Sequence, residues 1–194
     1  MRRRILERAV TVLVFPLVLL YRMRWLAYDT ISQTVAFVPE LAGVAVRRAW
    51  YSMTLAGCGS RLVVDFMGAI RTPQSKVGNN CYIGRANWVG NVCMGDDVIA
   101  GNCVTIHSGP HQHGFARKDI PMRLQPGHYE QVQIGSDVWL GSHVVVNADI
   151  APGTIVASGS VVTKTFPSYS IIGGVPARVL RSRFSGDEHP QDAG

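Results

Sequence analysis

The sequence has no apolar run long enough to cross a bilayer as a helix. Its longest run, residues 9–20, reads AVTVLVFPLVLL and contains Pro16, whereas a spanning helix needs about 20 apolar residues. The residues YRMRW follow this run, where a secretory signal peptide would have small residues at its cleavage site. A spanning helix and a cleaved signal peptide are therefore both disfavoured.

Cysteine is also scarce, and its spacing excludes the common zinc motifs. No two cysteines form a CxxC pair. They lie among small apolar residues, which predicts reduced thiols in the core of an intracellular protein. The four are Cys58, Cys81, Cys93 and Cys103.

The charge distribution disfavours a nucleic-acid partner. The chain carries 19 basic and 13 acidic residues, for a net charge of +6. The arginines gather in residues 1–50 and again near the C-terminus, while the middle of the chain is close to neutral. A nucleic-acid-binding protein would be expected to have a continuous basic stripe, so we expect no such partner.

The first 60 residues contain two apolar segments, each interrupted by a proline, Pro16 or Pro39, and flanked by arginines. This pattern predicts an apolar and basic helical region over residues 1–60. Such helices suit the cytoplasmic surface of a membrane, where arginines meet anionic head groups. Packing against the rest of the protein or against a sister subunit is the alternative.

Residues 61–166 contain an internal repeat with a period of six. An apolar residue is followed by glycine and then by turn-forming residues, as in Ile83-Gly84-Arg85-Ala86-Asn87 and Ile134-Gly135-Ser136-Asp137-Val138. This period fits neither an α-helix nor a plain alternating strand, but it fits the flat strands and sharp corners of a parallel β-helix. Glycine, asparagine and aspartate suit corners that need a positive φ or a close backbone approach. We therefore predict a mainly β fold, with a C-terminal extension and polar tail over residues 167–194.

Two stretches of this region resemble a known family. QIGSDVWLGSHVVV and IVASGSVVTKTFPSYSIIGGVPARVLRSR are similar to the closing coils and C-terminal extension of hexapeptide-repeat acyltransferases, such as maltose, galactoside and nodulation-factor O-acetyltransferases. The resemblance covers residues 77–183. It implies a left-handed parallel β-helix, a homotrimer, and acetyl-CoA bound between neighbouring β-helices. The N-terminal 60 residues instead resemble those of a membrane-associated subgroup that works in exopolysaccharide and lipid-linked saccharide biosynthesis.

The repeat stops at Ile106 and resumes at Ile134, which predicts a protruding loop over residues 107–133. Loops of this length inside a compact domain are usually functional. The loop begins with HSGPHQHGF, and the resemblance places the catalytic histidine of the family at His111. An imidazole ionises near neutral pH and can accept the proton of a sugar hydroxyl as general base. His113 is expected to contact the substrate.

The resemblance also implies the remaining site residues. Asn87 is expected to line the acetyl or acceptor site, and a backbone N–H of the Gly141–Ser142 corner is the candidate oxyanion donor. The acid that orients His111 is left open. The candidate acids are Asp96, Asp97, Asp119 and Glu130. The residues expected to bind the cofactor are Ser142, Ser160, Thr163, Lys164, Arg178 and Arg181.

These expectations together describe an acetyl-CoA-dependent O-acetyltransferase that acts by direct transfer, without a cysteine acyl-enzyme and without a metal. Its acceptor is expected to be a sugar or lipid-linked saccharide, at the cytoplasmic side of the bacterial inner membrane. The sugar, the hydroxyl and the length of the acyl group are left open. So are three alternatives: a serine acetyltransferase, a non-catalytic β-helix scaffold, and a zinc enzyme like the gamma-class carbonic anhydrases. The candidate zinc ligands are His107, His111, His113 and His143.

Overall fold

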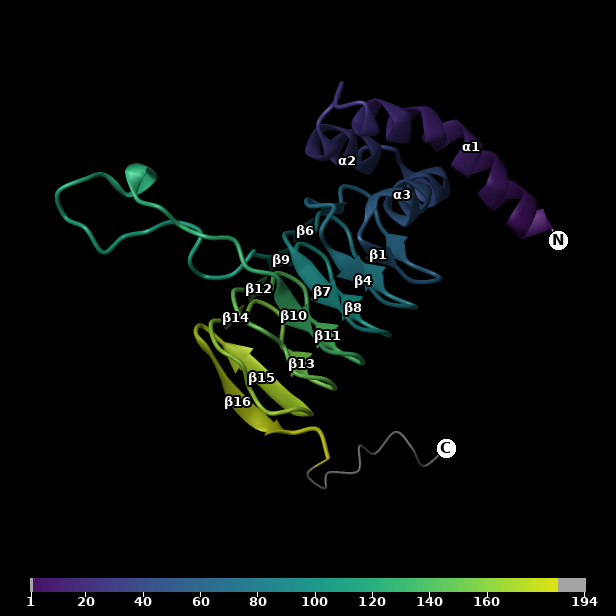
Figure 1. Ribbon diagram of the computed structural model, residues 1–194. Coiled ribbons are helices and arrows are strands. Elements are labelled where there is room, and N and C mark those ends of the chain that lie inside the picture. Colours follow the sequence, from purple (N-terminus) through teal and green to yellow (C-terminus); the bar gives the residue numbers. More distant parts are fainter. Residues whose placement is uncertain (1, 185–194) are drawn as a thin grey trace, which may run out of the picture.

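The computed structural model describes residues 2–184, and side chains from residue 9 onward. Three helices sit at one end of a column of short strands (Figure 1). The last helix ends at Thr54 and the first strand begins at Gly57. The helices are α1 (Arg2–Arg22), α2 (Tyr28–Ala36) and α3 (Glu40–Thr54).

The strands are mostly two residues long. The first nine are β1 (Gly57–Cys58), β2 (Val63–Val64), β3 (Ala69–Ile70), β4 (Lys76–Val77), β5 (Tyr82–Ile83), β6 (Trp88–Val89), β7 (Val92–Met94), β8 (Ile99–Ala100) and β9 (Thr105–Ile106). After the loop, which contains the 3-10 helix η1 (Met122–Leu124), come β10 (Val132–Ile134), β11 (Trp139–Leu140), β12 (Val145–Val146), β13 (Ile155–Val156), β14 (Val161–Val162), β15 (Ser170–Gly174) and β16 (Ala177–Ser182).

The strands form three sheets that run along the column. Their orders are β1-β4-β7-β10, β3-β6-β9-β12-β14 and β2-β5-β8-β11-β13-β15-β16. All pairs are parallel except β15 with β16, which form a closing hairpin. Equivalent positions in consecutive coils are about 17 residues apart in the sequence, and 40 residues apart where the loop intervenes. This confirms the expected parallel β-helix, which has about six turns.

The core of the β-helix follows from the alternation of side chains along each strand. The second residue of a strand points inward, so Ile83, Ala100 and Leu140 are at most 1% exposed. The residue before it points outward, because successive side chains of a strand lie on opposite faces. Burial of one apolar residue per strand, stacked on its equivalents in the next coils, is the main stabilising contribution.

At the corners, close backbone approach and positive φ are required at different positions. A Cβ on Gly84 would lie 2.6 Å from the carbonyl oxygen of Gly101 in the next coil, so this glycine is needed for close approach. Positive φ occurs two residues after such glycines, at Asn80 (58°) and Asp97 (59°). The same conformation is adopted by Ala86, Cys103, Asp137 and His143.

The cysteine prediction is correct for the thiol state and wrong for the location. All four cysteines are free, but only Cys81 is buried. Cys103 is exposed because it occupies a corner with a φ of 57°, where its side chain points away from the coil. Cys58 and Cys93 are partly buried.

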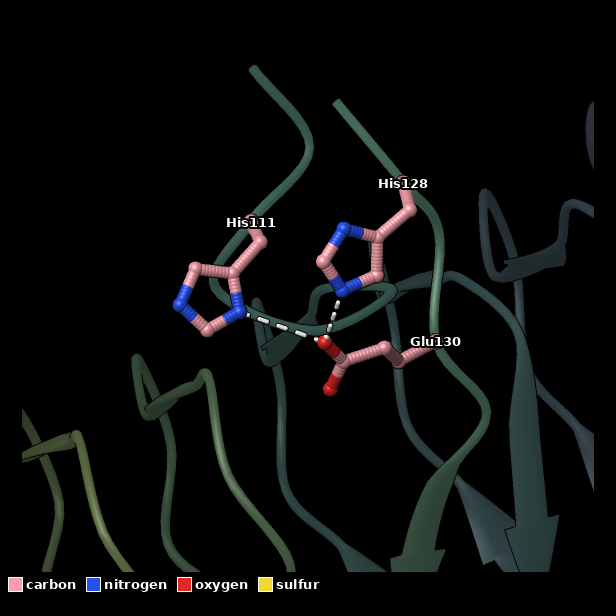
Figure 2. Close-up of side chains that lie close together, drawn as sticks. All are labelled: His111, His128 and Glu130. Carbon is pink, nitrogen blue, oxygen red and sulfur yellow. Dashed lines mark hydrogen bonds and ion pairs between the residues drawn. The ribbon is translucent and has the colours of Figure 1, made fainter. Parts of the chain in front are cut away.

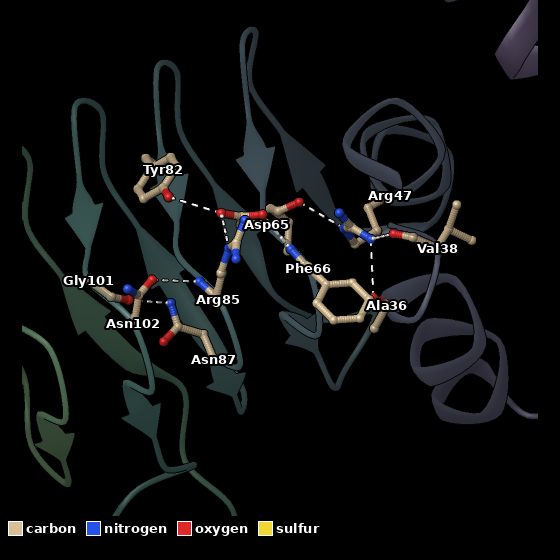
Figure 3. Close-up of polar contacts among 11 residues, drawn as sticks. Ala36, Val38, Arg47, Asp65, Phe66, Tyr82, Arg85, Asn87, Gly101 and Asn102 are labelled. Atoms are coloured by element: carbon tan, nitrogen blue, oxygen red, sulfur yellow. Dashed lines mark hydrogen bonds and ion pairs between the residues drawn. The ribbon is translucent and has the colours of Figure 1, made fainter. Parts of the chain in front are cut away.

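The helices are joined to the first coils by buried side chains. Arg47 of α3 is fully buried, and its Nε donates to the carbonyl of Val64 at 2.8 Å. Its Nη1 donates to the carbonyl of Ala36, which ends α2, and to that of Val38 just beyond it, at 2.7 Å for Val38 (Figure 3). The hydroxyl of Tyr51 accepts a hydrogen bond from the backbone of Ile70 at 3.0 Å. Within residues 2–184, no helix combines the length and apolar character needed to span a bilayer.

The long loop leaves the column after β9 and projects far from it before returning at β10 (Figure 1). Its end lies at residue 131 rather than 133, because Val132 already pairs with Val92 of the preceding coil. The protruding loop that the interrupted repeat predicts is thereby confirmed.

Candidate active site

The base of the loop is held together by hydrogen bonds between its outgoing and returning limbs. The backbone N–H of His128 donates to the carbonyl of His111, and that of Glu130 donates to Ser108, both at 2.9 Å. Gly109 has a φ of +80°, and a Cβ there would lie 2.8 Å from the Cβ of Glu130. Only glycine fits this position without strain, so the sequence itself sets how closely the two limbs approach.

Three side chains converge at this base (Figure 2). Nδ1 of His111 lies 3.2 Å from Oε1 of Glu130, and Nε2 of His128 lies 2.6 Å from the same oxygen. The two imidazole rings stack, with centroids 5.3 Å apart and an interplanar angle of 17°. Hydrogen bonds from His111 and then from His128 lower the pKa of Glu130, so its carboxylate is ionised and accepts from both rings.

Of the four acids left open by the sequence, only Glu130 contacts His111. Asp96 and Asp97 accept hydrogen bonds from asparagines of the neighbouring coil, and so help to join the coils. Asp119 pairs with Arg117 farther out along the loop. Sequence reasoning missed His128 altogether, because nothing in the sequence indicates which residues of the returning limb pair with those of the outgoing limb.

Two clefts flank the base of the loop. One, of about 210 Å³, is lined by Glu130 together with Thr163 from the last coils. The other, of about 510 Å³, is lined by the aromatic rings of Trp88 and Tyr129 and by Arg71, whose guanidinium lies 3.6 Å over the Trp88 ring. Tyr129 lines the larger cleft and the next residue, Glu130, lines the smaller one, so the same short segment contributes to both.

The residues expected to bind the cofactor divide into two groups. Ser160 is buried, donates to the carbonyl of Ala157 at 2.6 Å and accepts from the backbone of Gly174 at 3.1 Å. The hydroxyl of Ser142 accepts from the backbone of Asn102 at 3.2 Å. The others are exposed at the C-terminal end of the column, on or just after β14 and β16. They are Thr163, Lys164, Arg178 and Arg181.

Asn87 is placed inside the β-helix. The residue is 1% exposed, and its Nδ2 donates to Gly101 at 2.9 Å (Figure 3). Its Oδ1 accepts from the backbone N–H of Val104. Both ends of the amide therefore join one coil to the next. His113 is exposed and lies outside the cluster of His111, His128 and Glu130.

The four histidines named for a zinc enzyme do not come together within the described chain. Among residues 2–184, one group of three potential ligands converges, and it consists of His111, His128 and Glu130. His143 lies at a coil corner, with a φ of 60°. Nδ1 of His107 lies 3.3 Å from the side-chain nitrogen of Gln112.

Comparison with known proteins yields several relatives, although no protein-family model matches. Galactoside O-acetyltransferase from Escherichia coli K12 is 35% identical over 125 residues, which cover 58% of this chain and 59% of that enzyme. The match thus spans less than two thirds of the enzyme's length. A putative lipopolysaccharide biosynthesis O-acetyl transferase from the same strain is 32% identical over 135 residues, covering 65% of this chain and 67% of that protein.

Solved structures agree with these relatives. Galactoside acetyltransferase in complex with coenzyme A matches with a TM-score of 0.62 and 26% identity, over 80% of each chain. A hexapeptide-repeat acetyltransferase from Vibrio cholerae matches with a TM-score of 0.67 and 23% identity, over 81% of this chain and 91% of that one, and supports the fold. The repeat, the coil geometry and these similarities together show that the chain belongs to the hexapeptide-repeat acetyltransferase family.

Proposed function

We propose that the protein transfers an acetyl group from acetyl-CoA to a hydroxyl of a saccharide, with His111 as the general base. The observation that carries this proposal is the contact between His111 and the ionised Glu130 at the edge of a cleft that also contains Thr163. The similarity to a galactoside O-acetyltransferase supports the reaction type and the class of acceptor.

The orientation of His111 suits a base. When Nδ1 donates to Glu130, Nε2 carries a lone pair and can accept the proton of the acceptor hydroxyl. The oxygen then forms a bond to the thioester carbonyl carbon, and the C–S bond breaks. The imidazolium returns the proton to the departing CoA thiolate, while Glu130 stabilises its positive charge.

The donor is proposed to lie along the last coils, where Lys164, Arg178 and Arg181 offer cations for the phosphates of acetyl-CoA. One of the two backbone N–H groups at the Gly141–Ser142 corner remains as the proposed donor to the oxyanion. The N–H of Gly141 donates to Val156 at 2.8 Å, so it is already used, and the N–H of Ser142 is the remaining candidate.

The acceptor is proposed to occupy the larger cleft. Trp88 is 49% exposed and Tyr129 is 68% exposed there, and such rings stack against the apolar faces of sugars. Ser108 and Gln112 offer polar groups on the same wall. Gln112 directly follows His111, so a saccharide in this cleft would lie beside the segment that carries the proposed base.

We further propose that the working form is a homotrimer. Tyr82, Ile99 and Trp139 are direct neighbours on consecutive strands of one sheet and are 38%, 49% and 53% exposed. A row of large apolar side chains on a flat face suits burial against another copy of the chain. Light scattering of the intact protein tests this, and a monomer at micromolar concentration would contradict it.

A membrane surface is proposed as the partner of α1. This helix packs on α3 through Val14 and Val18, yet Val12 and Leu13 on its other side are 72% and 76% exposed. Residues 9–20 of α1 are apolar apart from Thr11, and a stretch of helix with apolar side chains in every direction needs an apolar environment on every side. Trp25, at 71% exposure beyond the end of the helix, suits the bilayer interface. Leu13→Glu should weaken sedimentation with anionic vesicles, and unchanged binding would contradict this assignment.

The central experiment incubates the purified protein with acetyl-CoA and a panel of saccharides, and detects acetylated product by mass spectrometry and free CoA by a thiol reagent. His111→Ala should reduce the rate by about 10²–10⁴-fold. Cys103→Ser is the matched control and should leave the rate unchanged, because this thiol lies at the corner between β8 and β9 and lines neither cleft. Equal activity of wild type and His111→Ala would exclude His111 as the base.

A further inference from the structure

We propose that His111, His128 and Glu130 form a binding site for Zn²⁺, and that zinc bound there inhibits acetyl transfer. The inhibition rests on the proposed function, whereas the binding does not. Two imidazole nitrogens and one carboxylate oxygen lie within 4.8 Å of one another. Imidazole nitrogens favour zinc over magnesium and calcium, which prefer oxygen ligands.

The ligands are held in place before any metal arrives. Backbone hydrogen bonds link the limbs that carry them, and Gly109 allows the limbs to approach. The distances from Oε1 of Glu130 to the two nitrogens, 3.2 and 2.6 Å, are near the roughly 3.3 Å between ligands of a tetrahedral zinc with bonds of about 2.0–2.1 Å. Small rotations of the three side chains would open room for the ion.

The site is accessible to ions and to water. The side chains of His111, His128 and Glu130 are 57%, 65% and 43% exposed. The cleft of about 210 Å³ beside Glu130 can supply a water as the fourth ligand.

Zinc would inhibit by changing which nitrogen of His111 carries the proton. The metal takes the lone pair of Nδ1, so the single proton of the neutral ring moves to Nε2 through solvent. Nε2 is the atom proposed to accept the proton of the acceptor hydroxyl, and a protonated Nε2 has no lone pair for this. The metal also withdraws Glu130 from its role of stabilising the imidazolium.

Isothermal titration calorimetry of the intact protein with ZnCl₂ tests the binding directly. We expect one zinc per chain and no binding of MgCl₂. His128→Ala should weaken zinc binding at least tenfold. His113→Ala, which removes another exposed imidazole of the same loop, and Cys103→Ser, which removes an exposed thiol, should leave it unchanged. Undiminished zinc binding by both His111→Ala and His128→Ala would overturn the site.

Activity measurements with and without zinc separate the two proposals. Zinc should abolish transfer by the wild type, EDTA should restore it, and His128→Ala should require at least tenfold more zinc for the same fractional loss. Transfer that persists in zinc-saturated protein would refute the inhibition. Zinc binding in a protein that never transfers acetyl groups would refute the proposed function and leave the metal site standing.

Discussion

Arg47 is predicted to be the main polar link between the helices and the β-helix. Its guanidinium is fully buried and reaches two separate elements, the start of the β-helix through Val64 and the end of α2 through Val35, Ala36 and Val38. The substitution Arg47→Met keeps much of the side-chain volume but removes every donor. It leaves the carbonyls of Val64 and Val38 without the guanidinium that donates to them, whereas those of Val35 and Ala36 still accept from backbone N–H groups.

The expected loss of stability follows from these contacts. The two shortest bonds, at 2.7 and 2.8 Å, each involve a charged donor and are worth about 1.5–3 kcal/mol. Within residues 2–184, Nη2 has no hydrogen-bond partner, so the desolvation of the guanidinium is only partly offset. We therefore expect Arg47→Met to lower the free energy of unfolding by about 3–5 kcal/mol. For a chain of this size the melting temperature would fall by about 6–20 °C.

Urea unfolding followed by far-UV circular dichroism measures this loss. Arg85→Met is the matched control, because Arg85 is 60% exposed and makes one surface ion pair with Asp65 at 3.4 Å. The control should cost at most about 1 kcal/mol. If the two variants lose the same amount, the carbonyl contacts of Arg47 do not hold the helices to the coils.

Three further outcomes are expected. Gly84→Ala should unfold at a lower temperature than Gly57→Ala. A Cβ at position 84 would lie 2.6 Å from the Gly101 carbonyl oxygen, whereas a Cβ at position 57 would lie 3.4 Å from Cγ of Lys76. Equal melting temperatures would contradict the need for glycine at position 84. Asn87→Ala leaves the buried N–H of Val104 unpaired, and should lower the free energy of unfolding in urea by about 1–3 kcal/mol. An unchanged free energy of unfolding would show that the amide does not join the coils. Lys164→Ala should raise the KM for acetyl-CoA with little change in kcat, and an unchanged KM would place the phosphates elsewhere.

The β-helix could be predicted from the sequence because each coil repeats the same local requirements. An apolar residue such as Ile83 must be buried, and the following Gly84 must allow the next coil to approach, so the period appears directly in the order of residues. The loop was equally visible as the gap between Ile106 and Ile134. These features depend on neighbours in the chain or on the next coil.

The candidate site was predictable only in part. His111 was identified from its place at the start of the loop, by resemblance. Its partner Glu130 and the second histidine, His128, are brought to it by hydrogen bonds between limbs 17 or more residues apart, and no local pattern reports such pairing. The amide of Asn87, a residue expected to line the acetyl or acceptor site, joins two coils through hydrogen bonds that no local pattern reports either.

The sequence by itself determined the repeating coil, the position of the loop and the helical start, because each depends on the side-chain pattern of neighbouring residues or of the next coil. Only the tertiary structure decided which acid meets His111, which histidine shares that acid, and which carbonyls Arg47 satisfies. These contacts depend on the path of the chain through space, where one hydrogen bond can join residues that the sequence keeps far apart.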